Sequence, residues 1–333
     1  MTALAPESIH DQTMIVSERP DRLWRRAVGN SRILVGGAIL LLVFLLCLAS
    51  LPWTTSKSSP LFYDQQETDA SQLPPAAHPF NRLFGTDVLG HSLLGRCLMG
   101  GVISLSIGIA AAAISVALGV SVGLLAGYRG GWVDSLLMRS VDVLYGLPYI
   151  LLVILFTIAL KDPLTAMVNK LHWGKDHWVS APMAANLMVL FLAIGLVSWL
   201  TMARVVRGQV LSLRAQPFIE ACKATGLKEW RIFTRHLLPN LVGPVIVYAT
   251  LTVPSAILQE SFLSFLGIGI QPPLPTWGSL ASDGLNAALN PIHSRWWLLV
   301  IPCTFLAVTL LSLNFMGDGL RDIFDPKREA SKI

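Results

Sequence analysis

The sequence predicts an all-α protein that crosses a membrane with six helices. Hydrophobic residues make up 53% of the 333 residues and charged residues only 14%, which is too apolar for one soluble domain. The mean hydropathy is +0.59. Polar segments separate six apolar runs, and each run falls within the roughly 17–25 residues that a helix needs to cross the hydrocarbon core.

The six runs divide the chain in order. They lie at 33–51, 103–127, 143–160, 187–203, 241–258 and 297–315. Each must be helical, because the backbone finds no hydrogen-bonding partner in lipid except itself. We therefore expect an N-terminal tail (1–32), a first helix (33–51), an outer loop (52–97), a domain with the other five helices (98–317) and a C-terminal tail (318–333).

The positive charges indicate the orientation. If both termini are cytoplasmic, the inner segments carry 18 of the 25 lysines and arginines, and the outer loops carry the other 7. This bias agrees with the positive-inside rule. It also explains the net charge of +5 without a nucleic-acid partner.

No motif predicts catalysis by this chain. The sequence lacks a phosphate-binding G-x4-G-K-[ST] loop and a nucleophile elbow, so nucleotide hydrolysis is not expected. The seven histidines are scattered and the four cysteines are far apart, which predicts neither a metal site nor a disulfide framework.

A polar stretch, 218–240, lies between the fourth and fifth apolar runs, on the predicted inner face. It reads as one short helix that ends at Gly226 and a second that ends before Pro239. Leu227, Trp230, Phe233 and Leu237 recur at helical spacing and are expected on one face. Such a helix suits either a membrane surface or a groove on another protein.

Three residues in or beside the spans are candidates for a transport path. Glu260 follows the fifth run, where a carboxylate either has a function or already reaches the outer headgroups. Asp142 lies close to Arg139 and suggests an interfacial ion pair. Pro148, like Pro244 and Pro254, is expected to kink a span.

The outer loops have their own patterns. The segment 84–91 is rich in turn residues and is expected to form a lip beside the second span. The segment 162–182, with Trp173 and Trp178 among charged residues, is expected at the headgroup level. The segment 271–278 belongs to the third outer loop, and its prolines are expected to make it stiff.

Several motifs resemble one family. Glu220-Ala221-Cys222-x3-Gly226-x9-His236-x-Leu238-Pro239 resembles the "EAA" cytoplasmic loop of ABC-importer permeases, with departures at Cys222 and His236. The stretches 84–90, 127–134, 260–269 and 317–322 narrow the resemblance to the C-type permease subunit of dipeptide and oligopeptide importers. The resemblance covers about residues 80–330.

The resemblance implies partners and roles. The loop would dock into a cytoplasmic ATPase through Glu220, Ala221, Cys222, Gly226, Trp230, His236, Leu238 and Pro239. Independently of the resemblance, Glu260, Asp142 and Pro148 are expected along the substrate path. The chain itself is expected in the bacterial inner membrane. Its expected partners are a second permease, two cytoplasmic ATPases that hold ATP and magnesium, and a periplasmic or lipid-anchored peptide-binding protein. No cofactor is expected on this chain.

Two alternatives remain open from the sequence. The same subunit type serves importers of nickel and other small solutes. An ion-gradient transporter that works alone is the alternative from another class, and it would show inverted repeats and charged mid-span residues.

Overall fold

The computed structural model describes residues 28–170 and 180–324, and within these ranges it contains helices and loops but no β-strand. The helices are α2 (Ser31–Thr54), η1 (Thr68–Ala70), η2 (Phe80–Arg82), α3 (Leu93–Arg129), α4 (Gly131–Tyr145), α5 (Tyr149–Lys170), α6 (Ala181–Arg214), α7 (Pro217–Ala224), α8 (Glu229–Ile232), η3 (Phe233–Leu237), α9 (Leu238–Phe265), α10 (Trp277–Ala288) and α11 (Trp297–Phe324).

Six helical segments are long and apolar enough to span a membrane. They are α2, α3, α5, α6, the continuous run Glu229–Phe265 that contains α9, and α11. The predicted all-α class with six spans is therefore confirmed. The helices extend beyond the predicted apolar runs: α3 begins at Leu93, ten residues before its predicted run.

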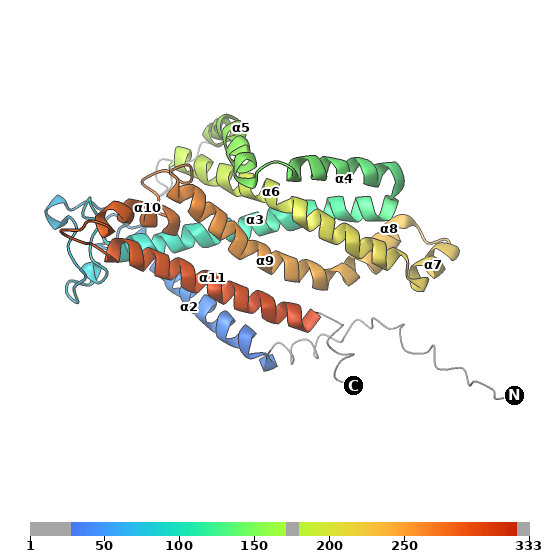
Figure 1. The fold of residues 1–333 in the computed structure, drawn as a ribbon, viewed down its shortest axis with the longest axis horizontal. Coiled ribbons are helices and arrows are strands. Elements are labelled where there is room, and N and C mark those ends of the chain that lie inside the picture. The colour runs from blue at the N-terminus through green and yellow to red at the C-terminus, as the bar shows by residue number, and fades with distance from the viewer. Residues whose placement is uncertain (1–27, 171–179, 325–333) are drawn as a thin grey trace.

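Helix α3 lies at the centre and packs along α6 and α9 (Figure 1). Three glycines at four-residue spacing make the α3–α6 contact close. A Cβ atom added at Gly119, Gly123 or Gly127 would come within 2.5–2.8 Å of atoms of α6. Small residues on one helical stripe let two membrane helices approach at backbone distance, so α3 and α6 form the rigid frame of the bundle.

The two ends of the bundle carry different structures. Helix α10 and the segment that follows α2 lie at one end, and α7 and α8 lie at the other (Figure 1). Helices α2 and α11 pack side by side along one flank. On the predicted orientation, the end with α10 faces outward.

The predicted third span, 143–160, is displaced in the structure. Val143 belongs to α4, which ends at Tyr145, and the membrane-length helix is α5. Pro148 therefore does not kink a span. It lies between α4 and α5, where its carbonyl accepts the first hydrogen bond of α5 from Leu152. Proline disfavours helical geometry in the residue before it, which explains the break.

The second short helix does not end before Pro239. From Glu229 the chain continues through the π-turn η3 into α9. The backbone N–H of Leu238 donates to the carbonyl of Phe233, five residues earlier. Pro239 sits in the first turn of α9, where its missing N–H costs least.

The third predicted outer loop, which precedes the last span, contains a helix that the proline pattern did not predict. This helix, α10, begins with a capping box in which Thr276 and Ser279 bond reciprocally. Residues 161–170 of the predicted second outer loop also continue α5. The rest of that loop through residue 179, with Trp173 and Trp178, lies outside the described residues.

Candidate functional site

The stretch 218–240 forms a hairpin of two short helices at one end of the bundle. Gly226 makes the turn with φ of +71°. Its N–H donates to the carbonyl of Lys223, and the N–H of Leu227 donates to that of Cys222. This bond pattern is a Schellman motif, which needs a residue in the left-handed conformation. The predicted end of the first helix at Gly226 is therefore confirmed.

The inner face of the hairpin packs against the ends of the long helices. Ile219, Ile232 and Leu237 are almost fully buried and join a cluster with side chains of α3, α6 and α9. The ring of Phe233 lies 4.3 Å from that of Tyr128 on α3, measured between ring centroids. A force on the hairpin would therefore reach three spans through direct apolar contact.

The outer face of the hairpin is exposed. Trp230 is 76% exposed and Leu238 is 41% exposed. The predicted shared face of Leu227, Trp230, Phe233 and Leu237 is wrong in part, because Leu237 is buried and Trp230 points out. The π-turn adds one residue to the backbone hydrogen-bond ring, which rotates Leu237 away from the face of Trp230.

The eight predicted docking residues gather on this hairpin and at the start of α9. Six are exposed and two are half-buried. The exposed residues are Glu220, Ala221, Gly226, Trp230, Leu238 and Pro239, and the half-buried ones are Cys222 and His236.

A second candidate site is a cavity of about 590 Å³ between α5, α6 and α9, with the end of α4 at its edge. Hydroxyl and amide side chains line it, and no lining residue is charged. The polar lining residues are Tyr145, Tyr149, Ser198, Thr201, Tyr248, Thr252, Ser255 and Gln259. The Tyr149 hydroxyl donates to Gln259 Oε1 across the cavity. We call this the mid-bundle cavity.

None of the three predicted path residues lines this cavity. Pro148 lies between two lining residues, Leu147 and Tyr149. Asp142 accepts from Arg204 at 2.8 Å, so its ion-pair partner in the structure is on α6 and is not Arg139. The Arg204 guanidinium also lies 4.0 Å from the ring centre of Tyr145, which places a charged pair at the edge of the cavity.

Glu260 lies on α9 next to Gln259 but is completely buried. Its carboxylate accepts hydrogen bonds from Ser264 at 2.7 Å, Ser104 at 3.1 Å and Ser261 at 3.4 Å. Because Ser104 belongs to α3, these bonds join two spans. Buried carboxylates are costly unless hydrogen-bonded, so this network positions α9 against α3.

A third cluster, which the sequence pattern did not predict, lies in the segment 84–96. The Asp87 carboxylate accepts from the backbone N–H groups of Leu89 and His91, from His91 Nδ1 at 2.7 Å and from Arg96 at 2.5 Å. Burial acts to raise the pKa of Asp87, but the hydrogen bond from His91 and the charge of Arg96 hold that pKa below its ordinary value of 3.8. Arg96 in the first turn of a membrane-length helix was the available signal, because such a charge requires a partner.

This depressed pKa predicts that the end of the bundle that carries α10 is labile to acid. The ionised Asp87 stabilises the fold above its unfolded pKa, and the stabilisation is lost as the pH falls below about 4 and the carboxylate binds a proton. Thermal unfolding in detergent should show Tm falling over this range, and Asp87→Asn should lower Tm at neutral pH and flatten the dependence. An equally steep dependence in Asp87→Asn would show that another group is responsible.

Comparison with known proteins gives one family. Residues 119–330 match the family described as the binding-protein-dependent transport system inner membrane component. This region contains the hairpin and every lining residue of the mid-bundle cavity.

Curated relatives are similar over nearly the whole chain. The dipeptide transport system permease protein DppC of Bacillus subtilis is 40% identical over 91% of this chain and 84% of its own length. The oligopeptide transport system permease protein OppC of Escherichia coli strain K12 is 42% identical, over 92% and 91%. A solved chain of the MetNI methionine ABC transporter shares the fold, with a TM-score of 0.50 and 17% identity over 67% of this chain and 94% of that one.

Proposed function

Because the chain belongs to the family of binding-protein-dependent transport system inner membrane components, we propose that it passes di- and oligopeptides inward as one permease of an ATP-driven importer. Membership of this family identifies the chain as a permease component of an ABC importer in the inner membrane. Peptide as the substrate is supported by relatives named as dipeptide and oligopeptide permeases at 40–42% identity. That identity over more than nine-tenths of the chain is the observation that carries the proposal.

The exposed hairpin is the proposed docking element for a cytoplasmic ATPase. Both termini are then cytoplasmic, and 98–317 is the permease domain. Two ATPases bind ATP and magnesium, a second permease completes the path, and a periplasmic or lipid-anchored protein delivers the peptide. Burial of a side chain as exposed as Trp230 contributes about 2–3 kcal/mol to such docking.

The chemistry of the mid-bundle cavity favours peptide over nickel. Hydroxyl and amide groups can hydrogen-bond to peptide bonds of any sequence, and eight of them line the cavity. Ser198, Thr252 and Ser255 already donate to carbonyls of their own helices, so these three would accept from a peptide. Nickel prefers imidazole, thiolate or carboxylate ligands, and none of these side chains is among the lining residues. We therefore place the substrate path along this cavity, in place of Glu260 and Asp142.

Reconstitution tests the proposal directly. The chain is assembled in proteoliposomes with its partner permease, its ATPases and its binding protein, and uptake of radiolabelled tripeptide is compared with uptake of nickel. We expect ATP-dependent uptake of peptide only. Uptake that follows an imposed ion gradient without ATP would instead support the gradient-driven transporter.

The lining of the cavity predicts the effect of one substitution. Gln259→Leu removes the amide that accepts from Tyr149 and should lower peptide uptake about tenfold, since about 1.4 kcal/mol of lost polar contact corresponds to that factor. Gln209→Leu changes an exposed glutamine of α6 that does not line the cavity and should leave uptake unchanged. Equal uptake by both variants would show that the substrate path does not run along this cavity.

A further inference from the structure

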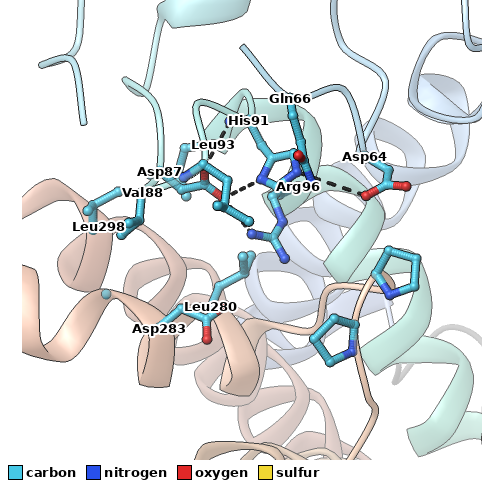
Figure 2. Close-up of a pocket in the computed structure, with 14 residues that line it drawn as sticks. Asp64, Gln66, Asp87, Val88, His91, Leu93, Arg96, Leu280, Asp283 and Leu298 are labelled. Carbon is cyan, nitrogen blue, oxygen red and sulfur yellow. Dashed lines mark hydrogen bonds and ion pairs between the residues drawn. The ribbon is translucent and has the colours of Figure 1, made fainter. Parts of the chain in front are cut away.

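A second cavity, of about 560 Å³, lies at the end of the bundle that carries α10. Figure 2 shows Asp64, His91 and Arg96 on one side of it and Asp283 of α10 on the other. Leu280, Leu298 and two prolines supply apolar walls. We call this the outer cavity, and it is distinct from the mid-bundle cavity, with which it shares no lining residue.

An imidazole nitrogen without a partner lies at this cavity. His91 is 3% exposed, and its Nε2 atom is buried without a hydrogen bond. The Nδ1 atom faces the Asp87 carboxylate, which only accepts, so Nδ1 carries the proton. Nε2 is then the ring nitrogen left for a partner from the cavity. Asp64 Oδ1 lies 3.9 Å from it, too far for a direct hydrogen bond.

The charges around the cavity leave negative charge uncompensated. Arg96 and Asp87 neutralise each other at 2.5 Å. Asp64 and Asp283 remain, and among the described residues neither has a lysine or arginine within 4.0 Å, although the charge of Arg96 acts on Asp283 from farther away. The cavity therefore presents two carboxylates and one unpaired imidazole nitrogen beside apolar walls. A cationic group with several N–H donors fits these acceptors.

Arg96 supplies one complementary donor. Its Nε atom is buried without a partner, and the side chain reaches into the cavity between His91 and Asp283 (Figure 2). A carbonyl oxygen beside the cationic group would accept from this N–H. An ammonium next to a carbonyl is the arrangement found at the amino terminus of a peptide.

We propose that the outer cavity binds the free amino terminus of a peptide, with the ammonium between His91 Nε2 and the Asp64 carboxylate, which lie 3.9 Å apart, and with Asp283 adding negative charge on the opposite wall. The inference rests on the proposed transport of peptides and names an entry site on this chain for that substrate. The carbonyl of the first residue accepts from Arg96, and the first side chain lies against the leucines and prolines. Recognition is by the charged amine and is independent of the peptide carboxylate.

Protection of an introduced thiol tests the site. Val88 is 49% exposed and lines the cavity. Val88→Cys is placed in the full chain with Cys222→Ala and Cys303→Ala, because the other two cysteines are buried. The chain is held in nanodiscs, and the rate of maleimide labelling is followed with Ala-Ala-amide, which keeps the amine, or with N-acetyl-Ala-Ala, which lacks it.

Ala-Ala-amide at ten times its dissociation constant should slow labelling about tenfold by occupancy, and N-acetyl-Ala-Ala should not slow it. Asp64→Asn with Asp283→Asn should remove the protection while labelling without peptide stays at the same rate, which shows that the site is still folded. Leu289→Cys, which is 69% exposed and outside the cavity, is the matched control and should show no protection.

Equal protection by the acetylated peptide, protection that persists in the double variant, or protection at Leu289→Cys would overturn the proposal. Peptide uptake by the reconstituted importer is measured separately. Uptake without thiol protection would reject the outer site alone, and thiol protection without ATP-driven uptake would reject the transport proposal alone.

Discussion

Gly226→Pro should abolish ATP-driven peptide uptake while the chain still inserts into the membrane. Gly226 has φ of +71°, whereas proline fixes φ near −65°, so the turn between α7 and α8 cannot keep its shape. The spans should still form without this turn, because each is long and apolar enough to cross the membrane. Uptake in proteoliposomes should fall at least about tenfold, the factor that corresponds to 1.4 kcal/mol of lost docking energy.

Two substitutions control this result. Gly226→Asn should retain uptake, because asparagine tolerates the left-handed region and a Cβ atom there meets no atom within 4 Å. Glu220→Lys reverses an exposed charge on the same hairpin and should also lose uptake, whereas Asp162→Lys at the far end of α5 should not. Normal uptake with either Gly226→Pro or Glu220→Lys would remove the hairpin from the coupling mechanism.

Glu260→Ala should have the largest effect on stability. It leaves the hydroxyls of Ser104 and Ser264 without their acceptor and opens space between α3 and α9. A buried network that loses its shared partner costs about 3 kcal/mol, which should lower Tm of the purified chain by several degrees. The measurement is thermal unfolding in detergent at neutral pH.

Glu260→Gln distinguishes the positioning role from a transport role. Its amide keeps one oxygen as an acceptor, and the serine hydroxyls that face the amide nitrogen can turn to accept from it. Tm and uptake should therefore stay close to those of the unmodified chain. Glu229→Ala, which removes an exposed glutamate, should leave Tm unchanged. If Gln at position 260 abolished uptake without lowering Tm, Glu260 would act on the substrate or on a proton instead of holding two helices together.

Apolar runs predicted the number of spans because lipid imposes one length and one hydrogen-bonding solution on each. The apolar runs did not predict the residues at which the helices begin and end. Helix α6 runs to Arg214, eleven residues beyond its predicted end, because hydrogen bonding continues where hydropathy falls. Helix α10 was missed because its proline-rich approach, 271–275, masked the capping pair of Thr276 and Ser279.

The sites were predictable to different degrees. The hairpin follows from local signals, Gly226 and the helical spacing around it, although the π-turn altered which side chains face outward. The mid-bundle cavity depends on packing among three distant helices. Glu260 and Gln259 are adjacent in sequence, yet only Gln259 reaches the cavity, and no local pattern distinguishes the faces of a helix that is apolar all round.

The central claim is that a separate ATPase binds the hairpin. A cross-link from position 230 tests this claim most directly. A photoreactive amino acid replaces Trp230, which is 76% exposed, and a second variant carries it at Trp132, which is 75% exposed. After irradiation of the assembled importer, the account predicts a covalent product between position 230 and the ATPase and little or none from position 132. Products from position 230 that contain only lipid, with no ATPase attached, would contradict it.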